Sequence, residues 1–191
     1  MDEEFLYVNS LAAGVGSNDI GLDRGQLGDN RVVRFTRSGN KVLLIQSNYG
    51  YRAVSNNTAE KKSVKEAFAE SVLFGFEIVV ETGNNLLVDL TPFLMQDAHG
   101  VSNTLARRGE GNFKLDAKRS ALYFPRIKNF PKNTEFEATL TFAGKPTGRY
   151  LRQVVPTPSS VTVRQHHSFV ELPDDGYEKR EMDPRLSLIH I

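Results

Sequence analysis

The sequence predicts a mainly β protein, with antiparallel sheets arranged as a sandwich or barrel and one or two short helices. Three observations lead to this prediction. Several segments alternate between apolar and polar residues, turn-forming residues separate them, and only one longer stretch has helical periodicity. The clearest alternation lies at residues 134–143, TEFEATLTFA, where every second residue from Phe136 to Phe142 is apolar. A period of two is what a half-buried antiparallel strand requires.

In chain order, residues 9–30 come first as a predicted loop, because they are rich in Gly, Asn and Asp. A hairpin is predicted from residues 32–36 and 41–46. The turn between them, Ser38-Gly39-Asn40, consists of small residues that tolerate positive φ. Residues 42–45 are apolar throughout, which is typical of a central strand covered on both faces.

The best helix signal covers residues 58–72. Val64, Phe68 and Val72 recur at i, i+4 and i+8, and Thr58 is a candidate N-cap. A second hairpin is predicted next, from strands at 73–81 and 86–90 with turn residues between them.

A second short helix is predicted at residues 90–97. Residues 112–116 and 121–124 are interpreted as a further pair of strands, and residues 161–172 as a long strand. The predicted β-rich domain therefore spans residues 1–172. Residues 173–185 are polar, contain two prolines and are predicted to be a linker.

Composition excludes several classes of function. The chain carries 24 Lys and Arg against 23 Asp and Glu, a net charge of +1, which argues against a nucleic-acid partner. It contains no cysteine, so disulfides, thiol catalysis and Cys-ligated zinc are excluded. No apolar run approaches the roughly 18 residues of a transmembrane helix. The acidic start, Met1-Asp-Glu-Glu, does not resemble a signal peptide.

The adjacent pair His166-His167 is the most conspicuous chemical feature. Two imidazoles can supply half of a zinc site. Neighbouring residues of a strand point to opposite faces, however, so the two rings cannot readily reach one metal ion. The favoured interpretation is a packed His167 and a solvent-facing His166.

Other candidate constellations are incomplete. The zinc-protease motif H-E-x-x-H and the serine-hydrolase motif G-x-S-x-G are both absent. Accordingly, no catalytic, cofactor-binding or metal-ligating residue is predicted within the chain. The Asn and Asp oxygens of the 9–30 loop can serve a cation only if the loop folds back; these residues are Asn18, Asp19, Asp23, Asp29 and Asn30.

Basic residues occur in pairs: Arg107-Arg108, Lys118-Arg119 and Arg126 with Lys128. They are interpreted as solvated loop charge, with phosphate or an acidic partner as the weaker alternative.

Four segments together resemble a known bacterial domain: residues 31–53, 70–79, 119–142 and 160–177. The string HHSFVELPDDGY at 166–177 is the most specific of them. They resemble the uncharacterised domain that precedes the catalytic domain in large bacterial zinc-dependent metalloproteases of the metzincin type.

The resemblance implies a parent protein that is a periplasmic or secreted multidomain peptidase. Its zinc would be held by an extended H-E-x-x-H motif downstream, and no residue of this chain matches that motif. It also implies two partners, the catalytic domain of the same polypeptide and a peptide or protein substrate of the parent.

The last six residues, 186–191, read LSLIHI. One frame of a common transposase-type sequencing adapter encodes this hexapeptide. We therefore interpret these residues as an artefact and the chain as a truncated gene fragment.

Two functional hypotheses follow. The first is a non-catalytic accessory or scaffold domain of a bacterial zinc-dependent metallopeptidase. The alternative is a free-standing β-sandwich module that binds a glycan or a peptide, with Tyr49, Tyr51 and Tyr150 as a possible contact surface.

Overall fold

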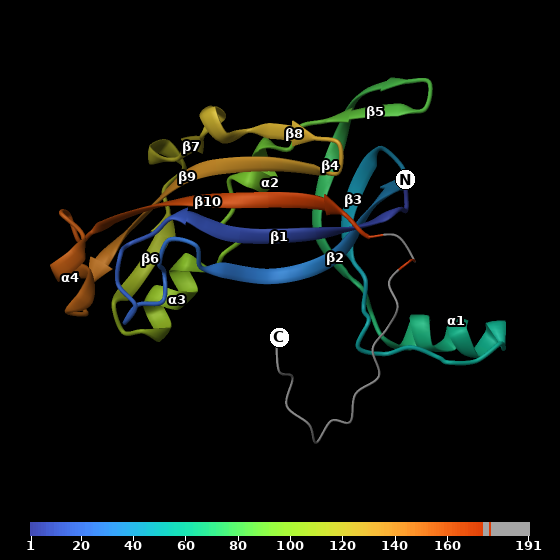
Figure 1. Cartoon of the computed structure of the whole chain (residues 1–191), viewed down its shortest axis with the longest axis horizontal. Helices are drawn as coiled ribbons and strands as arrows, with labels where there is room; N and C mark the ends of the chain where they lie inside the picture. Colours follow the sequence, from blue (N-terminus) through green and yellow to red (C-terminus); the bar gives the residue numbers. More distant parts are fainter. Residues whose placement is uncertain (174–175, 177–191) are drawn as a thin grey trace.

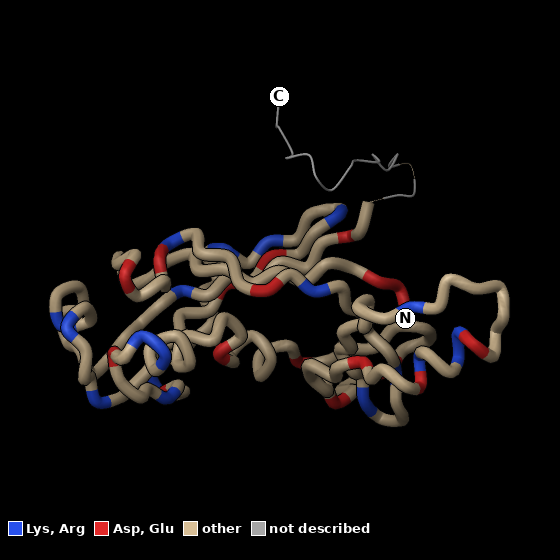
Figure 2. Tube along the Cα trace, turned by 90° about the horizontal axis from the view of Figure 1, so that it is seen from below, with Lys and Arg blue, Asp and Glu red and all other residues tan. Residues whose placement is uncertain are grey.

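The computed structural model describes residues 1–173 and 176, and it is mainly β, as predicted. The strands form one antiparallel, curled sheet in the order β5-β4-β3-β2-β1-β10-β9-β6, and β7 and β8 also pair with β9. The sheet resembles half of a barrel wall, and its central strands form an arched layer (Figures 1 and 2). Within the described residues the strands are β1 Glu4–Ala13, β2 Leu27–Ser38, β3 Lys41–Gln46, β4 Ser71–Thr82, β5 Asn85–Val88, β6 Gly111–Leu115, β7 Ala121–Leu122, β8 Lys128–Phe130, β9 Asn133–Pro146 and β10 Ser160–Glu171.

The helices are short, and there are more of them than predicted in the described part of the chain. Two further 3-10 turns, Ala117–Arg119 and Phe124–Arg126, flank β7. In chain order, the α-helices are α1 Thr58–Ala67, α2 Thr91–Leu94, α3 Val101–Arg107 and α4 Tyr150–Val154.

The first strand, β1, corrects the predicted loop at residues 9–30. β1 runs to Ala13 and β2 begins at Leu27, so only the middle of that range is a loop. β1 lies at the centre of the sheet, where it pairs with β2 on one side and with β10 on the other. The apolar alternation of β1 is interrupted by Asn9, which is buried. A polar residue at a buried position hides the alternation of apolar and polar residues in the sequence. The amide is tolerated there only because distant groups form hydrogen bonds with it.

Both predicted hairpins are confirmed. β2 and β3 pair across a turn in which Gly39 has φ of 61°, and β4 and β5 pair across a turn in which Gly83 has φ of 59°. Glycine adopts this left-handed conformation without the steric cost that a side chain would add. Local turn chemistry therefore sets the register of these hairpins.

The predicted pairing of residues 112–116 with 121–124 is wrong. β6 and β7 each pair with β9, at different places along it: Leu115 lies opposite Phe142, and Leu122 lies opposite Ala138. β9 has 14 residues, which is long enough to bind several short strands in succession along one edge.

The helix predicted at 58–72 is shorter than its apolar repeat suggests. Asn57, not Thr58, is the N-cap, and its side-chain oxygen accepts the backbone N–H groups of Ala59 and Glu60. The helix ends before Phe68, and Ser71 already belongs to β4. α1 buries no residue and projects from one end of the sheet (Figure 1). The pairing of β4 with β3 outweighs the helical preference of its first residues.

Helices α3 and α4 were not predicted, and in both a carboxylate satisfies the first turn. Asp97 accepts the N–H of Val101 at 2.7 Å, and the buried Glu110 accepts the N–H of Leu151 at 2.9 Å. Because Glu110 lies about forty positions earlier in the chain, no local signal marks the start of α4.

The apolar core consists of two clusters on the inner side of the curl. One cluster lies between β9, β10, α3, α4 and the 14–26 loop. The other lies between the four strands β1, β2, β3 and β4 and helix α2. The first contains Leu11, Val15, Ile20, Leu22, Val101, Leu105, Phe113, Ala138, Leu140, Phe142, Leu151, Val161 and Val163. The second contains Tyr7, Val33, Val42, Leu44, Phe76, Phe93 and Leu94.

The predicted boundary near residue 172 follows β10, which ends at Glu171. The predicted linker at 173–185 lies outside the described residues except at Pro173 and Gly176, and the hexapeptide at 186–191 lies wholly outside them.

Core packing on β9 makes a prediction about stability. Leu140→Ala removes a fully buried side chain and should lower the free energy of unfolding by about 2–5 kcal/mol. Leu87→Ala, at a strand position that is 59% exposed, is the matched control and should change it by less than about 0.5 kcal/mol. Urea denaturation of both variants measures the difference, and equal losses would contradict this account of the core.

Candidate functional site

A chain of buried polar side chains crosses the inner face of the sheet. His167 on β10 is fully buried, and its Nδ1 lies 2.8 Å from the hydroxyl of Tyr7 on β1. Its Nε2 lies 2.9 Å from Nε2 of Gln165 and 3.2 Å from the carbonyl oxygen of Leu94. Both ring nitrogens therefore have protein partners, and the expectation that His167 packs into the core is confirmed.

The same group of buried polar side chains holds the segment between α2 and α3 against the sheet. Gln165 donates through Nε2 to the carbonyl of Gln96 at 3.0 Å, and its Oε1 accepts the backbone N–H of His99 at 2.9 Å. Asn9 donates to the carbonyl of Ala98 at 3.0 Å. Because Asn9 and Gln165 are fully buried, these bonds also satisfy amides that would otherwise destabilise the core.

Burial changes the acid–base properties of this network. It lowers the pKa of His167 to about 4, because the charged imidazolium is poorly solvated there. It raises the pKa of Tyr7 to about 12 for the corresponding reason, since the phenolate is disfavoured. Both groups are therefore neutral near pH 7, which suits a structural role.

His166 lies on the opposite face of β10, as its position in a strand requires, but it is not free in solvent. Its side chain is 26% exposed, and its Nε2 lies 2.6 Å from Glu135 on β9. Its Nδ1 lies 3.4 Å from Glu137, and that carboxylate also pairs with Arg164 at 2.8 Å. His166 thus contacts two carboxylates of β9, one of which pairs with Arg164.

The structure does not bring together the residues considered for metal binding. Within residues 1–173 and 176, no group of three His, Asp or Glu side chains is arranged to hold a metal ion. Asp29 of the acidic loop pairs instead with Arg31 at 2.8 Å.

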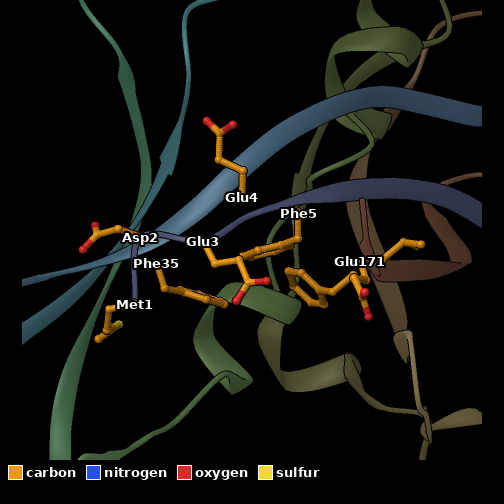
Figure 3. Close-up of a pocket in the computed structure, with 9 residues that line it drawn as sticks. Met1, Asp2, Glu3, Glu4, Phe5, Phe35 and Glu171 are labelled. Atoms are coloured by element: carbon orange, nitrogen blue, oxygen red, sulfur yellow. The ribbon is translucent and has the colours of Figure 1, made fainter. Parts of the chain in front are cut away.

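An aromatic pocket of about 440 Å³ opens where β1, β2 and β10 meet (Figure 3). Half-buried rings of Phe5, Phe35 and Phe169 form its floor, with the Phe5 and Phe35 centroids 5.1 Å apart. Its rim carries Glu3 and other acidic residues. The rim acids are Asp2, Glu3, Glu4 and Glu171.

The rim acids differ in how they are engaged. Glu4 points away from the aromatic floor, and its carboxylate accepts hydrogen bonds from Ser47 and Tyr49, which lower its pKa (Figure 3). Glu171 lies 3.8 Å from Lys132. The open side of the pocket therefore combines exposed apolar surface with negative charge.

A second cavity, of about 570 Å³, lies where the loop before β2 meets α3. His99, Arg107 and Arg108 line it together with Thr104, the glycine at position 28 and Asp29. We call it the arginine pocket. The sequence interpreted Arg107 and Arg108 as solvated loop charge. Both are exposed, as that interpretation requires, but Arg107 is the last residue of α3 and Arg108 is its C-cap.

The tyrosines considered as a contact surface are divided by the structure. Tyr49 and Tyr51 are each 57% exposed near α1, and Tyr51 stacks on Phe68 with centroids 3.8 Å apart. Tyr150 lies in α4 at the other end of the sheet, packed against the first core cluster. The three rings therefore do not form one surface.

Comparison with known families gives a match over most of the chain. Residues 25–190 match the family described as domain of unknown function DUF5117. The chain belongs to the DUF5117 family. The match begins within the loop before β2, so β1 of this DUF5117 domain precedes the matched range. No curated protein and no solved structure matches the chain.

No helix in the described part of the DUF5117 domain is long and apolar enough to cross a membrane.

The arginine pocket and the polar network could not be predicted from the sequence because their residues are scattered along it. Gln165 and the histidine at 99 are separated by 66 positions, and no short motif records such a contact.

Burial of His167 predicts a dependence of stability on pH. The pKa of His167 is about 4 in the folded protein against about 6.5 when exposed, so the unfolded chain binds a proton more readily. The contribution of His167 to the free energy of unfolding is therefore fully present well above pH 6.5. It is lost as the pH falls through 6.5 toward 4. Between pH 7 and pH 5 this group should account for a loss of about 2 kcal/mol.

His167→Gln provides the comparison. It removes the titrating ring, so the stability of the variant should fall less between pH 7 and pH 5 than that of the wild type, whatever its absolute value. Urea denaturation at the two pH values measures both slopes. Identical slopes would show that His167 is not buried in its neutral form.

Proposed function

We propose that this chain is a non-catalytic accessory domain of a bacterial zinc-dependent metallopeptidase, exported to the periplasm or secreted, which scaffolds the catalytic domain of the same polypeptide. The proposal rests on the four ordered segments that resemble the domain preceding such catalytic domains. The observation that favours a scaffold is the aromatic pocket, a partly exposed apolar surface at one end of a rigid sheet.

The polar groups of the domain support an architectural role. The ring nitrogens of His167 and the amides of Asn9 and Gln165 are engaged with one another and with backbone groups. These donors do not form a zinc site, so the proposal assigns no step of peptide hydrolysis to them. Zinc chemistry, in which the metal activates a water, would belong to the catalytic domain of the parent.

The aromatic pocket fits a partner segment that carries apolar and basic side chains. Phe5, Phe35 and Phe169 offer apolar surface, and the rim acids offer complementary negative charge. Aromatic residues in partly desolvated pockets commonly contribute a large share of binding energy. The partner we assign to it is a face of the catalytic domain.

A free-standing module that binds a peptide or glycan is the second candidate. The observation that favours it is the exposed stack of Tyr51 on Phe68, beside a cavity of about 680 Å³. Exposed aromatic rings are common in binding surfaces.

A first test concerns catalysis. The purified chain should not hydrolyse labelled casein above a mock preparation, with or without added zinc, and a chelator should change nothing. Zinc-dependent proteolysis that copurifies with the chain would contradict the proposal.

In the uncut gene, the reading frame should continue past residue 185 into an H-E-x-x-H motif. A stop codon there would favour the free-standing module.

A second test concerns the docking surface. Phe35→Ser should weaken the binding of this chain to the catalytic domain encoded downstream by about tenfold, because it removes part of the pocket floor. Val54→Ser, at a position that is 92% exposed and outside the pocket, is the matched control. Circular dichroism confirms that both variants fold, and calorimetry measures their affinity. Equal affinity of the two variants would exclude the aromatic pocket as the interface.

A further inference from the structure

We propose that the arginine pocket binds the oxyanion group of a small ligand, a carboxylate or a phosphate, through Arg107, Arg108 and His99. The inference is independent of the proposed function, because none of these residues belongs to the aromatic pocket. It rests on a positioned imidazole, two guanidinium groups without carboxylate partners and a cavity that all three line.

The imidazole of His99 is held in place by buried groups. Its Nδ1 lies 3.2 Å from Oδ1 of Asn9, and the amide nitrogen of Asn9 donates to the carbonyl of Ala98. That second bond fixes the orientation of the amide, so Oδ1 is the acceptor and Nδ1 of His99 carries the proton. Within the described residues Nε2 of His99 has no hydrogen-bond partner and remains available to a ligand.

Close packing at Gly28 supports the same arrangement. A Cβ at this position would overlap Oδ1 of Asn9 and lie 3.2 Å from Nδ1 of His99. Only glycine allows the start of β2 to pass this close to the pair. The local backbone is thus fitted to the Asn9–His99 contact, and the ring cannot turn freely.

The two guanidinium groups lack acidic partners in the described part of the chain. Arg107 contacts only the hydroxyl of Thr104, at 3.4 Å, and Arg108 forms no ion pair. Nearby carboxylates are otherwise engaged. Asp29, which also lines the pocket, pairs with Arg31, and Asp97 accepts backbone N–H groups at the start of α3. The pocket therefore keeps a net positive charge.

Oxyanions suit this set of donors. A planar guanidinium presents paired N–H groups that match the two oxygens of a carboxylate or phosphate, and such charge-assisted bonds are stronger than neutral ones. The cavity of about 570 Å³ leaves room for the body of a small organic ligand beyond its charged group.

Proton uptake should accompany binding. Burial lowers the pKa of His99, while Asp97 and Asp29 act in the opposite direction and the two arginines add positive charge nearby. An anion beside Nε2 would raise this pKa and favour the protonated ring, which then donates a hydrogen bond. Affinity should therefore rise as the pH falls from 7.5 to 6.

The test titrates the full chain with inorganic phosphate and, separately, with N-acetylglycine as a carboxylate probe, at constant ionic strength in chloride, by calorimetry. Saturable binding of either probe is expected, and the probe that binds more tightly identifies the source of the oxyanion. Arg107→Ala combined with Arg108→Ala should weaken that binding by at least about tenfold.

Matched controls separate a site from general charge attraction. Arg126→Ala combined with Lys128→Ala removes two exposed positive charges outside the pocket and should leave affinity unchanged. His99→Gln should remove the pH dependence of N-acetylglycine binding, whose carboxylate does not titrate in this range. Absence of saturable binding by both probes, or an equal loss in the Arg107/Arg108 and the Arg126/Lys128 double variants, would overturn the proposal.

Discussion

The pairing of β1 with β10 is the constraint on which the rest of the structure depends. It joins the two ends of the domain at the middle of the sheet, with Phe5 opposite Glu171 and Leu11 opposite Gln165. β10 then binds β9 along almost its whole length, and β9 carries the short strands β6, β7 and β8. Without this pairing the β1–β5 and β6–β9 strands would form separate sheets. Contacts between such distant residues carry a high loop-closure cost, which is typical of slowly folding β proteins.

The buried polar network reinforces that central junction. Tyr7 belongs to β1 and His167 to β10, so their contact bridges the two strands through their side chains as well as their backbones. Gln165 and Asn9 extend the network to the segment between α2 and α3. A fully satisfied network of this kind rigidifies a core and specifies one arrangement, because alternatives leave buried groups unpaired.

The two pockets lie at opposite ends of this network. The aromatic pocket is formed by residues of β1, β2 and β10 beyond the core. Its Phe169 stacks on Tyr7, which belongs to the network. The arginine pocket begins where the network ends, at His99. A sheet with a pocket at each end leaves room for two different partners at once. Figure 2 shows positive and negative residues interspersed over the chain, as expected for a net charge of +1, so the local charge of each pocket comes from a few residues.

Local patterns were sufficient to predict the two hairpins, the long strands β9 and β10 and the burial of His167, because alternation and turn residues act over a few neighbouring positions. Tertiary structure decided the remainder. β1 needs distant partners for Asn9, α4 needs the carboxylate of Glu110, and β6 and β7 take their places from β9 rather than from each other. Membership of the DUF5117 family is established by the amino-acid sequence alone, without the structure. The pockets could not be predicted in that way, since Phe5 meets Phe169 only after β1 has paired with β10, and Asn9 meets His99 only after the segment between α2 and α3 has packed against the sheet.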